Sequence, residues 1–478
     1  MPGTDWQVAT VDNPYGADNT TNSRRHISSN VQTIQSFFLK DKIVVTYGRR
    51  KDVSKAYSID TTRQIRTGTN GSTGLADGAG FAWWYDQFDG RKQRPDAYAL
   101  DQVRSGNTRL VDVVIHPVSW LSIFYDESNT HDPPSSIKLN LDGTPTQVGD
   151  GIGKNYGVTF HLLKDNLMLR INRQTTSVTQ GINNTLRAAG GLGGVNPFRN
   201  VAYNIERAVI LAGAPSSVKY ASFSESVRSI GSGNRPASQR ETYDVVSDLV
   251  AKGTEIELIA NPTPNWRLSA SFARNDSVET NLGGSWMGFI ADRLPVWARY
   301  KNSFNFPSTT QTVNDLVVGN GINSWNFIKE SEGKSVAQMS RDRVNVTSRY
   351  GWAQGPFKGA FVGGSWRYRS PAVIGYGSKV AKGSELPFTE GFIAPNETLT
   401  INDIAKPISG RALNELDSFL GYSRRILKNK VTWRVQLNIR NLFDNVERRG
   451  QATLSNGDIA VFTIPEKRTF ILTNTFSF

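Results

Sequence analysis

The stretch Val-Thr-Trp-Arg-Val-Gln-Leu-Asn-Ile-Arg, residues 431–440, decides the fold. Every odd-numbered residue in it is apolar and every even-numbered residue is polar. Side chains alternate between the two faces of a β-strand, so the stretch predicts a strand with one apolar and one polar face. A helix would repeat its apolar residues at every third and fourth position, which this stretch does not do.

The same alternation recurs along the chain, from a first strand expected over about residues 27–38 to a last one at residues 468–478. In the last strand, Phe470, Leu472, Phe476 and Phe478 share one face. The apolar faces of the strands between them carry Ile43, Val45, Tyr47; Leu121, Ile123, Tyr125; Val158, Phe160, Leu162; Leu167, Leu169, Ile171; Trp266, Leu268, Ala270, Phe272; Val344, Val346, Tyr350; Ala360, Val362, Trp366, Tyr368; and Leu416, Leu420, Tyr422.

Short turns and long connections alternate between these strands. The short turns are rich in Gly, Pro, Asn and Asp and are expected at 39–41, 116–118, 164–166, 261–265, 354–356 and 427–429. The long connections are expected at 51–107, 128–154, 179–249, 278–342, 371–415 and 444–465. Short turns at one rim and long loops at the other are typical of an outer-membrane β-barrel. The sequence therefore predicts an all-β fold, an antiparallel transmembrane β-barrel with long extracellular loops.

Six hairpins and a terminal strand make about thirteen strands. An antiparallel barrel closes only when its first and last strands oppose each other, which an odd count prevents. We therefore expect about 13–14 strands of a larger barrel over residues 31–478, with residues 1–30 forming an N-terminal loop or a partial strand.

Composition excludes several classes of protein. Mean hydropathy is −0.40 and there is no cysteine, which excludes disulfide scaffolds, zinc fingers and cysteine nucleophiles. No run approaches the roughly 18 apolar residues of a membrane helix. The net charge of +13 suggests an anionic partner, such as lipid headgroups, lipopolysaccharide or an anionic solute. The basic residues form no single cluster, so nucleic acid is not favoured.

The sequence shows no recognised catalytic or metal-binding pattern. The four histidines, His26, His116, His131 and His161, form no H-E-x-x-H motif and no helical ligand spacing. We expect no catalytic residues, no metal and no cofactor, and we expect that the chain is not an enzyme.

Near the C-terminus the sequence resembles the barrel region of TonB-dependent outer-membrane receptors. Residues 437–444 match the family signature through Asn438, Asn441, Leu442, Phe443 and Asp444. About twenty residues later, 465–470 resembles the start of the family's last strand, and Phe478 supplies its terminal aromatic residue. Residues 251–258 and 261–268 resemble a further family hairpin.

The resemblance implies a 22-stranded barrel around a plug, importing a scarce solute such as a siderophore, vitamin or saccharide across the Gram-negative outer membrane. It implies energy from the TonB–ExbB–ExbD complex, which acts through the plug. It also implies that the barrel-assembly machinery reads Phe470, Leu472, Phe476 and Phe478. No signal peptide, TonB box or plug is visible, so we expect a C-terminal portion, a fragment of a receptor.

Two groups of residues are candidate ligand contacts. Trp83, Trp84, Tyr85 and Phe88 in the first long connection either stack on a solute or form the core of a loop. Lumen-facing arginines either pair with acids along the wall or on a plug, or attract an anionic solute; they are Arg343, Arg349, Arg367, Arg369, Arg434 and Arg440.

Three smaller expectations remain open. Residues 197–213 have helical spacing and predict a short helix within a long connection. A plugless, porin-like passive channel is one alternative function. A soluble β-protein that binds glycans is another.

Overall fold

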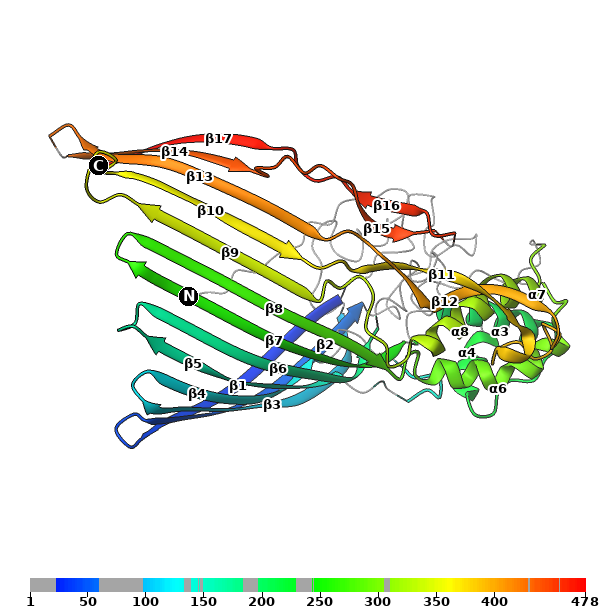
Figure 1. The fold of residues 1–478 in the computed structure, drawn as a ribbon. Coiled ribbons are helices and arrows are strands. Elements are labelled where there is room, and N and C mark those ends of the chain that lie inside the picture. Colours follow the sequence, from blue (N-terminus) through cyan, green and yellow to red (C-terminus); the bar gives the residue numbers. More distant parts are fainter. Residues whose placement is uncertain are drawn as a thin grey trace, which may run out of the picture.

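The structure is a computed structural model of the 478-residue chain, and it describes residues 23–59, 98–132, 139–144, 146, 149–183, 197–228, 243, 245–304, 310–428, 430–454 and 456–478. Its main feature is a 13-stranded antiparallel sheet in which neighbours along the chain are neighbours in space (Figure 1). The strands are β1 (Ser23–Phe38), β2 (Ile43–Ile59), β3 (Tyr98–Val118), β4 (Leu121–Asp132), β5 (Gly149–Leu162), β6 (Leu167–Ile182), β7 (Val246–Thr263), β8 (Trp266–Thr280), β9 (Asp342–Gly351), β10 (Ala360–Arg369), β13 (Leu413–Ile426), β14 (Val431–Arg440) and β17 (Thr469–Ser477).

The expected antiparallel all-β fold and its six hairpins are confirmed. Two boundaries differ from the expectation. The first strand already begins at Ser23, and β2 and β3 reach Ile59 and Tyr98, well into the segment 51–107 expected to be a connection. Polar residues on both faces of these strand ends hide the alternation that marks the rest.

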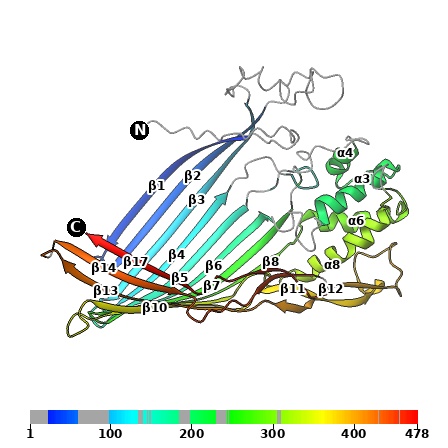
Figure 2. The same ribbon diagram turned by 90° about the horizontal axis from the view of Figure 1, so that it is seen from above.

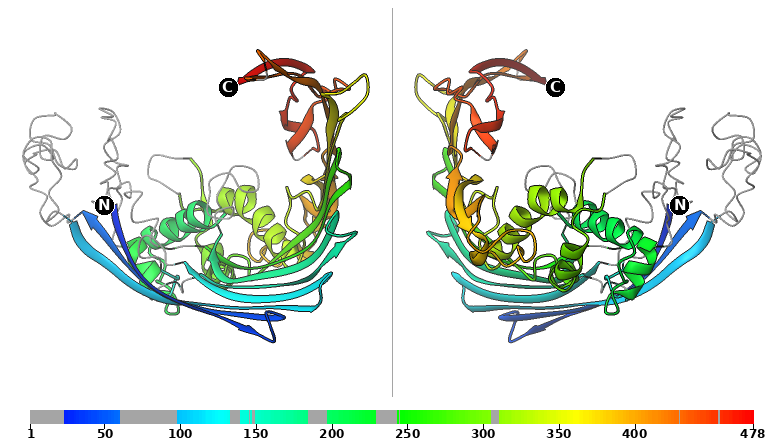
Figure 3. Two further views of the ribbon diagram at one scale, coloured as in Figure 1. Left: turned by 90° about the vertical axis from the view of Figure 1, so that its left-hand side faces the viewer. Right: turned by 90° about the vertical axis from the view of Figure 1, so that its right-hand side faces the viewer.

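The sheet curves into an open trough (Figure 3). Within the described residues, β1 pairs only with β2, and β17 pairs only with β14. β1 and β17 are therefore the two edge strands of the sheet. Figure 2 shows the strands running side by side from the short turns at one end to the long connections at the other.

Contacts between side chains on different strands show which face of the sheet is concave. The guanidinium of Arg349 on β9 lies 4.7 Å from the centre of the Phe361 ring on β10, and that of Arg434 on β14 lies 5.2 Å from it. Because β13 separates β10 from β14, the side chains meet by converging on the inside of the curve. Phe361, Arg349 and Arg434 therefore lie on the concave face.

The convex face is apolar. One row of residues in direct register crosses six strands from β8 to β17: Trp266, Tyr350, Val362, Leu420, Leu437 and Leu472. The odd-numbered residues of β14 lie on this face, and none of Trp433, Val435, Leu437 and Ile439 is in a buried core. Large apolar side chains here stay exposed, as Trp366 at 37% and Leu420 at 51% illustrate.

Short turns close the hairpins at one end. Leu39, Lys40 and Asp41 all have positive φ, and so do Leu163, Lys164 and Asp165, with values between 53° and 66°. Positive φ in tight hairpin turns matches the right-handed twist of the flanking strands. The strand ends therefore stay aligned at this rim, where the C-terminus also lies (Figure 1).

At the opposite end, long connections fold into a helical lobe (residues 197–228, 281–304, 310–331 and 373–409). Its elements are η4 (Pro197–Ala202), α3 (Tyr203–Leu211), α4 (Ala221–Arg228), α6 (Ser285–Arg299), α7 (Val313–Leu316), η5 (Val317–Gly321), α8 (Ile322–Ser331), η6 (Gly383–Glu385) and the hairpin β11 (Val373–Lys382) and β12 (Thr398–Ser409). None of the described helices has both the length and the apolar composition needed to cross a bilayer. A second hairpin, β15 (Arg449–Thr453) and β16 (Ile459–Thr463), follows β14.

A single hydrophobic core holds the segments of the helical lobe together. Trp286, Trp297 and Trp325 are at most 1% exposed, and Leu386 and Ile401 from the β11–β12 hairpin belong to the same cluster. The expected short helix over residues 197–213 is confirmed by η4 and α3. The sequence does not predict the remaining helices, because their segments are rich in Gly, Ser and Asn, as loops are.

Candidate functional site

The concave wall of β9, β10 and β14 brings the six predicted lumen arginines onto one face. Arg343 and Arg349 lie on β9, Arg367 and Arg369 on β10, and Arg434 and Arg440 on β14. The register places Arg343 opposite Arg369 and Arg367 opposite Glu415. The wall is therefore arginine-rich, and its charges fall into a paired and an unpaired group.

Acidic side chains, two of them on β13, hold the paired group. Arg367 lies 2.8 Å from an oxygen of Asp417 and 3.3 Å from one of Glu415. Arg449, from β15, lies 2.8 Å from the other Glu415 oxygen, and Arg440 lies 4.0 Å from Glu466. The Arg367 and Arg440 side chains are about half exposed, so each of their pairs contributes at most about 1 kcal/mol.

Three arginines for which no acidic partner is found within the described residues lie together near the short turns. Arg349 stacks on one side of Phe361, which is 4% exposed, while Arg434 reaches the same ring from β14. Arg267 on β8 lies directly opposite Arg349 in the register. None of these three arginines forms an ion pair with another residue of the described ranges. Arg267 and Phe361 were not predicted as site residues, because only the strand pairing reveals that they adjoin Arg349.

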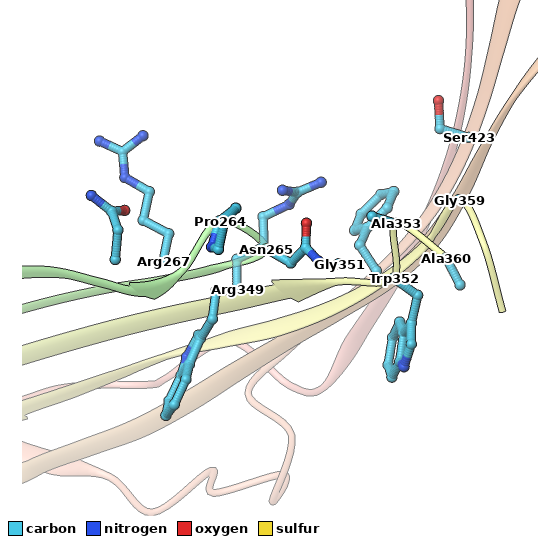
Figure 4. A pocket seen from close by; sticks show the side chains of 13 residues that line it. Pro264, Asn265, Arg267, Arg349, Gly351, Trp352, Ala353, Gly359, Ala360 and Ser423 are labelled. Carbon is cyan, nitrogen blue, oxygen red and sulfur yellow. The ribbon is translucent and has the colours of Figure 1, made fainter. Parts of the chain in front are cut away.

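A cavity of about 440 Å³ opens beside this group. Arg267, Arg349 and Phe361 line it together with the turn residues Asn265 and Trp352. Figure 4 shows Arg267 and Arg349 extending toward the same side of the sheet. The cavity can accept an anion, since its lining offers cationic and amide donors and includes no carboxylate.

The signature residues form the corner after β14. Buried Asn441 has a positive φ of 48°, and its side-chain amide donates to the backbone carbonyls of Asn445 and Glu466 at 3.1 and 2.9 Å. The Asp444 carboxylate accepts the backbone N–H of Arg468 at 2.8 Å. Asn and Asp tolerate positive φ and bond to nearby backbone, which explains these residue types at this corner. Leu442 donates its N–H to the Leu416 carbonyl at 2.7 Å, whereas Phe443 is 76% exposed and Asn438 lies on the concave face of β14.

The aromatic residues of the last strand are exposed. Phe470, Leu472 and Phe476 lie on the convex face at 62%, 65% and 53% exposure, and Phe478 follows β17 at 98%. They are accessible to a membrane or a protein partner, as a recognition signal must be.

The other predicted contacts give no site. Trp83, Trp84, Tyr85 and Phe88 lie outside the described residues. Of the histidines, His116 shares a hydrogen bond of 2.8 Å between its Nδ1 and the Ser122 hydroxyl. Within the described ranges, no three His, Asp or Glu side chains come close enough together to hold a metal ion.

The helical lobe contains a buried polar network instead of a ligand site. Glu206 is fully buried and accepts hydrogen bonds from the Ser224 hydroxyl, Arg293 Nε and Trp297 Nε1 at 2.8 to 2.9 Å. Arg293 also donates to the Pro215 carbonyl at 2.9 Å. The carboxylate and the guanidinium satisfy each other, so the network fixes the helices relative to one another.

Comparison with known proteins gives structural matches only. No family model and no curated protein sequence matches the chain. Among solved structures it is similar to the ferric-catecholate import receptor Fiu of Escherichia coli K12, with 13% identity and a TM-score of 0.48 over 96% of this chain and 46% of that one. It is also similar to two receptors of Acinetobacter baumannii. The siderophore receptor PiuA has 13% identity and a TM-score of 0.47 over 95% of this chain and 44% of that one. The ferric preacinetobactin receptor BauA has 11% identity and a TM-score of 0.48 over 95% and 43%. The chain thus spans less than half the length of each of these receptors.

Proposed function

We propose that the chain forms the wall of a TonB-dependent outer-membrane receptor that imports a scarce solute. The observation that carries the proposal is the convex apolar row from Trp266 to Leu472, in which five of the six side chains are exposed although the protein has a well-packed core elsewhere. Soluble monomers rarely expose apolar patches of this extent, whereas the lipid-facing side of a barrel requires one.

The two ends of the sheet have different roles in this proposal. The short turns lie at the periplasmic rim and the helical lobe lies outside the cell, where it meets the solute first. The concave face lines the water-filled path. No bond is made or broken; the wall contributes shape and charge.

The partners follow from this arrangement. Lipid covers the convex face, and lipopolysaccharide surrounds the outer rim. The barrel-assembly machinery reads the last strand through Phe470, Leu472, Phe476 and Phe478. TonB–ExbB–ExbD supplies energy through a plug, and the solute belongs to the siderophores, vitamins or saccharides.

Fractionation of the native cells tests the location. We expect the polypeptide that contains this chain to stay with the outer membrane after washing with carbonate and with urea. Its recovery in the soluble fraction would contradict the proposal and support a soluble glycan-binding protein.

Planar-bilayer conductance tests the kind of transport. We expect no steady open pores from the purified chain, because an odd number of antiparallel strands cannot close into a barrel. Steady, uniform pores would overturn energised import in favour of a porin-like passive channel.

A further inference from the structure

We infer that the concave face carries a binding site for a multivalent oxyanion at its short-turn rim, formed by Arg267 and Arg349 beside Phe361. The ligand is a small, water-borne phosphate or polycarboxylate. The inference rests on the proposed function only in requiring that the concave face is open to water.

The arginine pair itself is the first observation. Arg267 and Arg349 lie directly opposite each other on β8 and β9, and like charges in this position destabilise a sheet. Neither forms an ion pair within the described part of the chain, whereas Arg367 on the next strand has two acidic partners. An anion bound between the two guanidinium groups would convert the repulsion into attraction.

The Arg349 guanidinium is held in place without an acid. Arg349 lies over the Phe361 ring at 4.7 Å, and Arg434 lies near the same ring at 5.2 Å as a third positive charge. Cation–π contact fixes a guanidinium while leaving its N–H donors free at the edge. The Arg349 side of the site is therefore preorganised, which lowers the entropy cost of binding a ligand.

The cavity is the second observation. Its volume of about 440 Å³ exceeds what a small hydrated anion needs, and its lining adds Asn261, Asn265 and Ser423 as hydrogen-bonding groups. No carboxylate competes for the arginines there. Arg pairs bidentately with phosphate and carboxylate oxygens, which identifies the ligand as an oxyanion.

A phospholipid headgroup could offer the same chemistry, but the geometry favours a free anion. Arg267 and Arg349 extend from the concave face (Figure 4), whereas lipid would contact the convex face through Tyr350 and Val362. The experiment therefore uses free phosphate and citrate first and phosphatidylglycerol second.

Calorimetric titration of the full chain, refolded in an uncharged, phosphate-free detergent, tests the site. We expect inorganic phosphate and citrate to bind, and Arg349→Gln to weaken binding about tenfold or more. Arg424→Gln is the matched control. It removes one exposed arginine near the same rim from the convex face, in register with Trp433, and should leave binding unchanged. No binding to the wild type, or equal losses in both variants, would overturn the inference. Binding to phosphatidylglycerol micelles but not to the free anions would overturn it in favour of a lipid site.

Chemical protection tests the same site in the unaltered protein. Phosphate should slow the modification of Arg267 and Arg349 by phenylglyoxal, measured by mass spectrometry, and leave the rate at Arg424 unchanged. Equal rates at all three arginines with and without phosphate would refute the site. Failure here leaves insertion of the sheet into lipid untouched, whereas failure to insert contradicts the proposed function whether or not an anion binds.

Discussion

The helical lobe and the sheet bury their apolar side chains in different ways. In the lobe, Trp297 and Trp325 are completely buried by other protein groups. On the convex face of the sheet, Val362 and Leu420 are 43% and 51% exposed, and no described segment covers them. One chain therefore combines a core of the kind found in soluble proteins with a surface that needs lipid. The lobe is therefore stabilised by contacts within the protein, whereas the sheet is stabilised by contact with lipid. Each region can be tested independently.

The largest effect is expected from breaking the buried ion pair of the lobe. Arg293→Ala leaves the fully buried Glu206 carboxylate without its charged partner, which should destabilise the lobe by about 3–5 kcal/mol. Denaturant unfolding followed by tryptophan emission measures this. Insertion of the sheet into lipid should not change.

The control for that pair is on the surface. Arg341 and Asp276 lie 3.5 Å apart with both side chains about half exposed, so Arg341→Ala should cost less than about 1 kcal/mol. Similar losses for the two variants would contradict the assignment of a tightly packed lobe.

A charge on the convex face should produce the next largest effect. Val346 lies in register with Ala270 and Trp366 on this face, and Thr347 is the next residue, on the concave face. Val346→Arg should weaken folding into lipid vesicles by about 2–4 kcal/mol, because it places a cation in hydrocarbon. Thr347→Arg should have little effect, and urea titration of the vesicle-bound chain measures both. A larger effect at Thr347 would contradict the assignment of the convex face to lipid and the concave face to water.

The corner after β14 should respond with an intermediate effect. Asn441→Ala leaves two backbone carbonyls and the Asn445 N–H without their partner and places alanine at positive φ. We expect a loss of about 1–3 kcal/mol in the same urea titration. Phe443→Ala, in the same motif but 76% exposed, should cost less. A greater cost at Phe443 would show that the corner depends on lipid contact rather than on its hydrogen bonds.

The smallest effect concerns the start of α7. The backbone N–H and the hydroxyl of Thr312 donate to the Asp315 carboxylate, and these hydrogen bonds lower the pKa of Asp315 below its usual 3.8. Since the folded pKa is depressed, this stabilisation is complete above the unfolded pKa and is lost as pH falls through the folded one. The stability difference between wild type and Asp315→Asn should therefore shrink with acidification below about pH 4. A difference that is constant with pH would contradict this role of the carboxylate.

The sequence predicted the sheet because strand alternation is a local signal. Residues 431–440 display it fully, and the expected turns lie within or next to the observed ones, as at Leu39–Asp41. The lobe was mostly missed because its core joins three distant connections. Trp286 packs against Phe223 at 5.3 Å between ring centres, a contact with no local signature.

The candidate site, too, is predictable from the sequence only in part. The alternation of side chains along the strands is enough to predict that Arg349 and Arg434 lie on the same, polar face of the sheet. That Arg267 adjoins Arg349, and that Phe361 lies within reach of both Arg349 and Arg434, depends on strand pairing across the long β8–β9 connection, which no local pattern specifies.

Spin-label accessibility along β14 tests the central claim most directly. Single nitroxides at positions 433–440 of the vesicle-inserted chain would be exposed to oxygen, which concentrates in lipid, and to a water-soluble nickel chelate. The account predicts a period of two, with Trp433, Val435, Leu437 and Ile439 favouring oxygen and Arg434, Gln436, Asn438 and Arg440 favouring the chelate. Uniform accessibility, or the opposite alternation, would contradict it.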